Sequence, residues 1–152
     1  MRTQSLLPKR PSRSQKRGPA GQSLVEFALL LPILMIIFVG VLDLGRMYNA
    51  YMTIQNASRE GARYGSDRST DVSGIRAAVR AEAANSGITI TDAMIPAPTV
   101  QNDGTFRDPP NNTQPNQSIT VQVNYPFSLI TTFLLAGQQT IPISANTTMQ
   151  VK

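Results

Sequence analysis

A nineteen-residue apolar run near the N-terminus constrains this chain more than any other feature, and it extends from Leu24 to Leu42 with Glu26 as its single ionisable residue. An α-helix rises about 1.5 Å per residue, so the run approaches the ~30 Å thickness of a bilayer's hydrocarbon core. A buried helix of a soluble protein normally keeps one polar face, whereas residues 28–42 carry no charged side chain on any face. The run therefore predicts a membrane-spanning helix, which we place at residues 22–43.

Two residues inside the run are unusual for a membrane helix. Pro32 lacks an N–H group and its ring clashes with the carbonyl of Ala28, so it predicts a local kink. Glu26 lies near the start of the run, where its carboxylate can stay at the level of the lipid headgroups. Alternatively, Glu26 needs a positive partner once the helix is packed within protein.

The basic residues are concentrated in front of the apolar run. Residues 1–21 contain six basic and no acidic side chains, whereas the rest of the chain contains eight basic and nine acidic ones. The formal charge of +5 therefore belongs to a basic leader and not to a folded surface, which argues against a nucleic-acid partner. Positive charge before the span predicts a cytoplasmic N-terminus and an extracytoplasmic domain at residues 44–152. A secretory signal peptide is the competing interpretation, but the run is long for one and no A-x-A-like site follows it.

The residue inventory excludes several kinds of chemistry. The chain has no cysteine and no histidine, so thiolate catalysis, disulfides, imidazole triads and zinc sites with these ligands are excluded. Asp67, Asp71, Asp103 and Asp108 do not have the spacing of an EF-hand loop, and acidic residues in such loops ordinarily form turns. We find no phosphate-binding loop or nucleophile elbow. We therefore predict no metal, no cofactor and no enzymatic activity.

The stretch Gly21-Gln22-Ser23-Leu24-Val25-Glu26-Phe27 resembles the recognition site of prepilin peptidases. In that family the cut falls after the glycine, and glutamate is the fifth residue of the mature chain, followed by an aromatic residue. The resemblance implies cleavage between Gly21 and Gln22, and it implies that Glu26 pairs with a positive charge during assembly. Glycine also suits a tight protease groove because it has no side chain.

Beyond the run, apolar and small residues recur at three- and four-residue spacing as far as Tyr64, which predicts one helix of about forty residues. The tract over residues 21–65 resembles TadE-like proteins, which are minor pilins or pseudopilins of the bacterial tight-adherence (Flp) pilus system. Two short motifs carry much of the resemblance, D-x-G-R and A-S-R-E-G-A-R. Their principal residues are Asp43, Gly45, Arg46, Arg59, Glu60, Gly61 and Arg63.

The charged residues of the second motif have a simpler interpretation as a solvated helix face. Glu60 and Arg63 are spaced to form an i,i+3 ion pair, while Arg59 and Arg63 form a like-charged i,i+4 pair. A specific contact with a partner protein is the alternative.

The resemblance implies a structural role in pilus biogenesis. A TadE-like minor pilin would be processed by a prepilin peptidase and would contact other pilins, the assembly platform and membrane lipid. It would reside in the bacterial inner membrane with a single span, or in the pilus itself. A bitopic membrane protein, whose outer domain acts as a scaffold or binds a ligand in a secretion complex, remains the alternative.

The rest of the chain predicts a small α+β domain. A second helix is expected at residues 74–85, capped by Ser73 or Asp71 and ended by Gly87. Alternating apolar residues predict strands at 88–95, 118–127 and 140–151. A short strand near residues 99–101 is compatible with the long exposed loop expected at 96–117, and residues 128–136 predict a helix on the sheet or a segment touching the membrane. The expected fold class is a long N-terminal transmembrane helix that continues into a pilin-like domain with a small antiparallel sheet.

Overall fold

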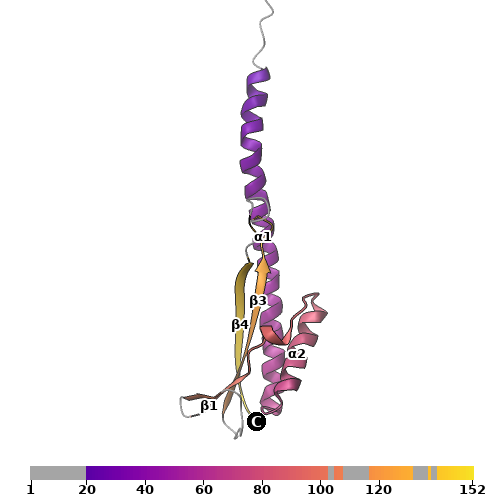
Figure 1. Ribbon diagram of the computed structural model, residues 1–152, viewed down its shortest axis with the longest axis vertical. Helices are drawn as coiled ribbons and strands as arrows, with labels where there is room; N and C mark the ends of the chain where they lie inside the picture. The colour runs from indigo at the N-terminus through magenta and orange to yellow at the C-terminus, as the bar shows by residue number, and fades with distance from the viewer. Residues whose placement is uncertain (1–19, 103–104, 108–116, 132–136, 138–139) are drawn as a thin grey trace, which may run out of the picture. The chain divides into compact units, whose positions relative to one another are not determined.

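The computed structural model describes residues 20–102, 105–107, 117–131, 137 and 140–152. The helices are α1 (Ala20–Asp67), α2 (Val72–Asn85) and the short 3-10 helix η1 (Asp92–Met94), and the strands are β1 (Thr99–Asn102), β2 (Thr105–Arg107), β3 (Ser118–Ser128) and β4 (Thr140–Gln150). The chain divides into two compact units, Met1–Ile36 and Ile37–Lys152. The predicted α+β class is confirmed (Figure 1).

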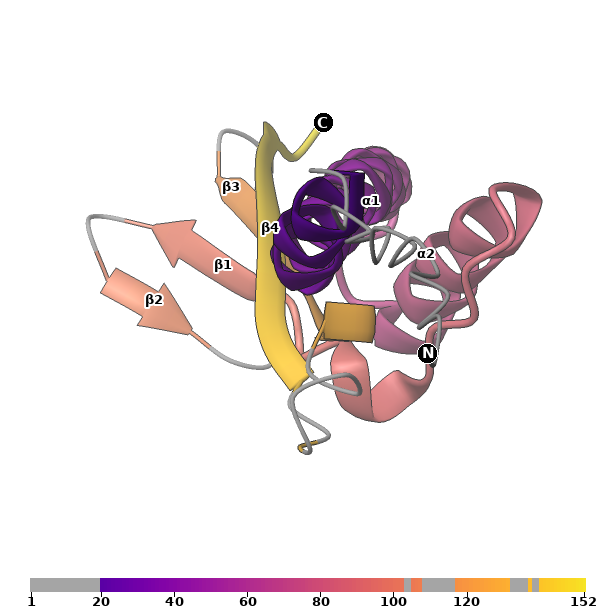
Figure 2. The same ribbon diagram turned by 90° about the horizontal axis from the view of Figure 1, so that it is seen from above.

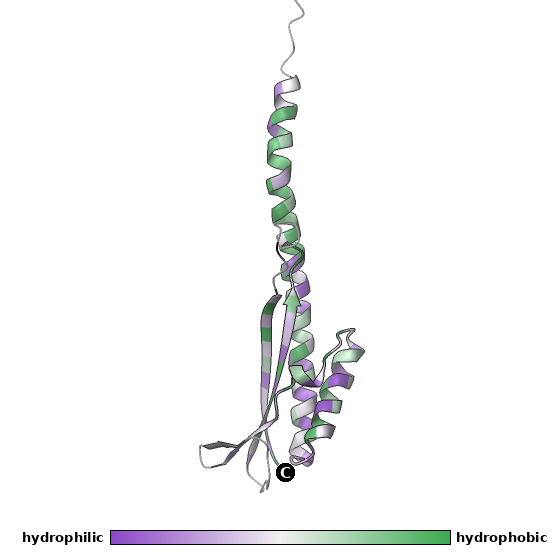
Figure 3. Cartoon of the chain, in the orientation of Figure 1, coloured by the Kyte–Doolittle hydropathy of each residue, from purple (hydrophilic) through white to green (hydrophobic). Residues whose placement is uncertain are grey.

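In the first unit, helix α1 leaves its apolar side chains uncovered. Leu24, Phe27, Leu29 and their apolar neighbours are exposed. Figure 3 shows that this part of α1 is mostly hydrophobic along its length. Among the described residues, α1 is the one helix that is long and apolar enough to cross a membrane. Because burying apolar surface is the main favourable contribution to folding, this helix requires an apolar environment that the described residues do not supply. The helix thus suggests a single membrane anchor.

The second unit is built around a four-stranded antiparallel sheet of order β2-β1-β3-β4. Strands β3 and β4 pair along eleven residues, from Ser118 opposite Gln150 to Ser128 opposite Thr140. Helix α1 lies between these two strands and α2 (Figures 1 and 2). The alternating apolar residues of β3 face this helix, and Ile119, Val121 and Val123 are fully buried.

The strands predicted at 118–127 and 140–151 are confirmed as β3 and β4, and the short strand near 99–101 is β1. The strand predicted at 88–95 is wrong, since this segment is irregular and ends in η1. Its initial alternation still has a physical cause, because Ile88 is partly buried and Ile90 is buried, whereas Thr89 and Thr91 are exposed. An ion pair of 2.7 Å between Arg80 and Asp92 fastens the segment to α2 in place of a sheet neighbour.

Two regions of the sequence behave differently from the expectation or lie partly outside the described residues. The loop expected at 96–117 contains β1 and β2, which form a hairpin in which Asn102 lies opposite Thr105. Residues 108–116 of that loop lie outside the described residues. In the segment 128–136, Ile130 and Thr131 are helical, and residues 132–136 also lie outside the described part.

Helix α1 packs closely against its neighbours because its contact face carries small residues. A Cβ atom on Gly61 would collide with Cγ2 of Val79 in α2 and would lie 3.2 Å from Cγ1 of Val121 in β3. A Cβ atom on Gly65, one turn further on, would lie 2.9 Å from Cδ1 of Ile119. These two glycines form a notch that lets α2 and β3 approach the backbone of α1.

A buried hydroxyl group fastens the same face of α1 to the sheet. The Oγ atom of Ser58 is fully buried and lies 2.9 Å from both the carbonyl oxygen of Val121 and the Oγ1 atom of Thr147. A buried polar group is tolerated only when it is hydrogen-bonded, and these two partners satisfy the Ser58 hydroxyl.

Helix α2 ends at Asn85 as predicted but begins at Val72, two residues before the predicted start, and Asp71 is its N-cap. The Asp71 carboxylate accepts hydrogen bonds from the Gly74 N–H at 2.9 Å and the Tyr64 hydroxyl at 2.9 Å. At the other end, Gly87 adopts a φ of 77° just beyond the last turn, a left-handed conformation that glycine adopts without a steric penalty. The Asp71 cap therefore joins α2 to the last turns of α1.

The Asp71 cap should make stability depend on pH. The Ser73 hydroxyl, the Gly74 N–H and the Tyr64 hydroxyl lower the pKa of Asp71. A carboxylate with a lowered folded-state pKa stabilises the protein above its unfolded value of about 4, and this contribution is lost as the pH falls through the folded pKa. Asp71→Ala should therefore lower the free energy of unfolding at pH 7 and have less effect at pH 3. Denaturant titrations at both pH values measure this.

Asp71→Asn is the matched control, because asparagine caps helices well and does not titrate. It should retain stability at pH 7 and remove the contribution of residue 71 to the pH profile. An identical pH profile for the wild type and Asp71→Ala would contradict the assignment.

Candidate functional site

The residues that resemble a peptidase site lie at the beginning of α1. The helix starts at Ala20, so the bond between Gly21 and Gln22 lies in its first turn. Apart from its chain neighbours and the nearby helix backbone, no described atom lies within 4 Å of a Cβ built on Gly21. The Gln22 Nε2 atom donates a hydrogen bond of 3.2 Å to Glu26 Oε1, and the pair is exposed. Both sides of the bond between Gly21 and Gln22 are therefore uncrowded within the described residues.

The first turn of a helix is also the part that unfolds most readily, because its N–H groups have no partner within the helix. Glycine lowers helix stability by about 1 kcal/mol relative to alanine. The location of Gly21 thus reduces the cost of drawing this peptide bond into an extended conformation, as a protease groove requires.

The membrane-span residues lie along α1. Leu24, Phe27 and Leu42 are exposed, and Pro32 lies inside the helix, whose assignment continues through it. The kink expected at Pro32 stays a prediction. The exposed apolar surface at these positions is what a helix in contact with lipid presents.

Directly after the span, the Asp43 carboxylate is buried, with only 3% of the residue exposed. It accepts hydrogen bonds from the backbone N–H of Ile130 at 3.0 Å and of Thr131 at 2.7 Å, and from the Thr131 hydroxyl. Arg46 Nη1 adds an ion pair at 3.1 Å. Asp43 thereby fastens α1 to the segment that follows β3, and these donors stabilise its ionised form.

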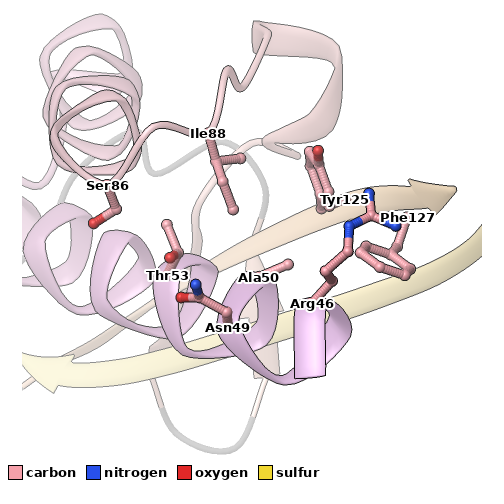
Figure 4. A pocket seen from close by; sticks show the side chains of 8 residues that line it. All are labelled: Arg46, Asn49, Ala50, Thr53, Ser86, Ile88, Tyr125 and Phe127. Carbon is pink, nitrogen blue, oxygen red and sulfur yellow. The ribbon is translucent and has the colours of Figure 1, made fainter. Parts of the chain in front are cut away.

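Arg46 connects this junction to the sheet. Its guanidinium lies 5.2 Å from the centre of the Phe127 ring, which is a cation–π distance. It also lines a pocket of about 210 Å³ between α1, β3 and the end of α2, together with Asn49, Ser86 and Tyr125 (Figure 4). Gly45 has open space around it, so the D-x-G-R motif combines two anchoring residues with one exposed glycine.

Removing the Asp43 carboxylate should loosen the segment after β3. In Asp43→Ala, the amides of Ile130 and Thr131 lose a charged acceptor, and their hydrogen exchange should accelerate roughly tenfold or more. Hydrogen-exchange mass spectrometry of the peptide containing both amides measures the change. Asp67→Ala is the control, because Asp67 makes an exposed ion pair of 3.1 Å with Lys152. Equal exchange at Ile130 in the wild type and Asp43→Ala would refute this role.

The A-S-R-E-G-A-R motif divides into buried and exposed positions. Gly61 lies in the notch, whereas Arg59 is exposed. Arg63 Nε donates a hydrogen bond of 2.8 Å to Glu60 Oε2. This contact lowers the pKa of Glu60 and raises that of Arg63. The exposed charges form an i,i+3 pair on the solvent side of the helix, and such pairs contribute little to stability.

Two of the four aspartates that were considered for a calcium site have other contacts. Asp71 caps α2 and Asp67 pairs with Lys152, while Asp103 and Asp108 lie outside the described residues.

The comparison with protein families matches the same part of the chain. Residues 21–63 match the family model described as TadE-like protein. These residues form a TadE-like segment. It begins at Gly21, ends at Arg63 and lies entirely within α1. Comparisons with curated proteins and with solved structures found no match.

Within the TadE-like segment, the motif residues could be found from the sequence, but the hydrogen bonds of Asp43 and the packing at Gly61 could not. The hydrogen bonds of Asp43 join positions 87 and 88 residues apart, and backbone amides leave no trace in a sequence. An acidic residue at the boundary of an apolar run was the available indication. The notch was also missed, although small residues four apart on a helix face, as at Gly61 and Gly65, favour close packing.

Proposed function

We propose that this protein is a minor pilin, or pseudopilin, of a tight-adherence (Flp) type IV pilus. A TadE-like segment begins at the glycine of a site resembling that of prepilin peptidases, and this coincidence carries the proposal. The exposed apolar side chains of α1 support it, because such a helix can exchange lipid for the helices of other subunits. The role is structural, not catalytic.

The bilayer supplies the physical logic of assembly. The subunit waits in the inner membrane, with its basic leader in the cytoplasm and residues 44–152 outside. A prepilin peptidase cuts after Gly21 and creates a new α-amino group on Gln22. The assembly platform then extracts the subunit, and its apolar helix packs on those of other pilins in the pilus that mediates adhesion.

Within such an assembly, Glu26 pairs with the α-ammonium group of a neighbouring subunit. Its carboxylate is exposed, and its hydrogen bond to the Gln22 side chain is an exposed contact that a stronger partner can replace. Two opposite charges that are buried together each lower the cost of burying the other. Glu26 would therefore select helices that have been cut at the correct position.

Cleavage is the first step to test. Co-expression with a prepilin peptidase should yield a mature chain that starts at Gln22, and Gly21→Arg should leave the chain uncut, because a bulky charged side chain blocks a site selected for glycine. N-terminal sequencing and a mass shift on gels report the cut. Ser14→Arg is the control, since it adds the same charge within the leader and should be processed normally.

Persistence of the Met1 terminus in the wild type, with an active peptidase present, would contradict the pilin proposal. The bitopic scaffold would then become the better account.

A further inference from the structure

One end of the second unit exposes apolar side chains on both α1 and the sheet. On α1, Leu44 is 61% and Tyr48 is 67% exposed. On the sheet side, Ile130 and Ile141 are also exposed. Between α1 and β4 lies an apolar groove of about 420 Å³, lined by Leu44, Met47, Tyr48, Tyr51 and Ile143.

Asp43 fixes the level of this surface relative to the end of the apolar run. Asp43 directly follows Leu42, and its carboxylate accepts hydrogen bonds from the backbone N–H groups of Ile130 and Thr131. Residues 37–42, Asp43 and the segment after β3 all belong to the second unit. When the apolar run lies in hydrocarbon, the segment after β3 must therefore lie at the membrane surface.

The charge distribution fits the same environment. From Leu44 to Ser58, α1 contains one charged residue, Arg46, and it is paired with Asp43. Strands β3 and β4 contain none. Tyrosine is enriched at the interface between membrane and water, because its ring is apolar and its hydroxyl is polar. An uncharged surface with exposed tyrosine suits lipid headgroups better than it suits bulk water.

We propose that this surface, defined by Leu44, Tyr48, Ile130, Ile141 and Ile143, docks into the headgroup layer of the bilayer. The proposal rests on the membrane anchor of the proposed function. Tyr48 lies about 9 Å along the helix beyond Leu42, which is comparable with an interfacial layer of ~5–8 Å. The anchor thus continues into a docked domain, and the second unit lies on the membrane instead of standing off it.

The absence of tryptophan provides a direct test with the full chain. Single-tryptophan variants Tyr48→Trp and Ile143→Trp are reconstituted in phosphatidylethanolamine–phosphatidylglycerol vesicles that contain headgroup-nitroxide lipid. Both tryptophans should be quenched several-fold more strongly than the tryptophan of Ala84→Trp, the control at an exposed position of α2. Tyr48→Trp retains an aromatic ring and preserves the test where Ile143→Trp disturbs the strand.

Phe38→Trp reports on the anchor separately, with nitroxides on the acyl chains. Quenching at position 38, with positions 48 and 143 no more quenched than position 84, would overturn the docking and leave the anchor intact. Absence of quenching at position 38 would overturn the anchor and the docking together. The groove could instead hold a second copy of the chain. In that case the tryptophan at position 143 would be shielded from the nitroxide only at high protein density, and the chains would crosslink to one another. This result would also overturn the proposal.

Discussion

Replacing Glu26 with alanine is expected to reduce incorporation of the subunit into pili by roughly two to four orders of magnitude, while leader cleavage and membrane insertion continue. Deleting one partner of a buried ion pair typically costs ~3–5 kcal/mol, because the other charge stays buried without compensation. Insertion itself becomes easier, since a carboxylate is costly in an apolar helix. Surface pilus yield and crosslinking to the major pilin measure the effect.

The proposed pairing can be separated from general damage with two further variants. Glu26→Gln keeps the shape and hydrogen-bonding capacity of the side chain but removes its charge, so it should impair incorporation nearly as much. Glu82→Ala removes a carboxylate from α2 and should incorporate normally. Equal pilus yields and equal crosslinks for the wild type and Glu26→Ala, at matched protein abundance, would remove charge pairing from the mechanism.

Gly61→Val should strongly destabilise the second unit. The added side chain would enter the notch, where even a Cβ atom would collide with Val79 and crowd Val121. Overpacking a core typically costs ~1–3 kcal/mol, and a cost of this size lowers the melting temperature by roughly 5–20 °C for a domain of about 100 residues. Thermal unfolding of the full chain in detergent micelles, followed by circular dichroism, measures the shift.

Gly45→Val is the matched control for Gly61→Val. Both glycines belong to the family motifs and lie on α1, but a Cβ atom on Gly45 meets nothing within 4 Å. Valine is a better helix former than glycine by a few tenths of a kcal/mol, so this substitution should be neutral or slightly stabilising. Equal losses of stability for the two variants would show that helix propensity, and not the notch, determines the effect.

The sequence predicted the elements whose patterns depend on local contacts. The long helix follows from the continuous apolar run and from the three- and four-residue spacing beyond it. The strands β3 and β4 follow from strict alternation, since one face of each must be buried. The segment 88–95 begins with the same alternation but is no strand, because its backbone pairs with no strand, although η1 lies against β3. Alternation reports burial of every second side chain, and a sheet is only one way to achieve it.

For the candidate site, the sequence predicted which residues are involved but not which contacts they make. A motif indicates which positions matter, but it does not distinguish Gly45, which is open, from Gly61, which lies in the notch. That distinction depends on Val79 and Val121, which come from two other elements. Similarly, Asp43 could be recognised as a charge at the end of the span, but its backbone partners could not. They lie in a distant segment, and almost any residue type can supply a backbone N–H group.

The sheet is attached to α1 at two separated levels, and this has a mechanical consequence. Asp43 fastens one level to the segment after β3, while at the other level the Lys152 N–H donates to the Ser66 carbonyl at 3.0 Å. A pulling force directed along α1 therefore loads these attachments, and the packed face between them, in shear. The contacts must break together and cannot peel apart one by one. In the assembly that we propose, this arrangement would keep the domain folded while the helix is drawn out of the bilayer.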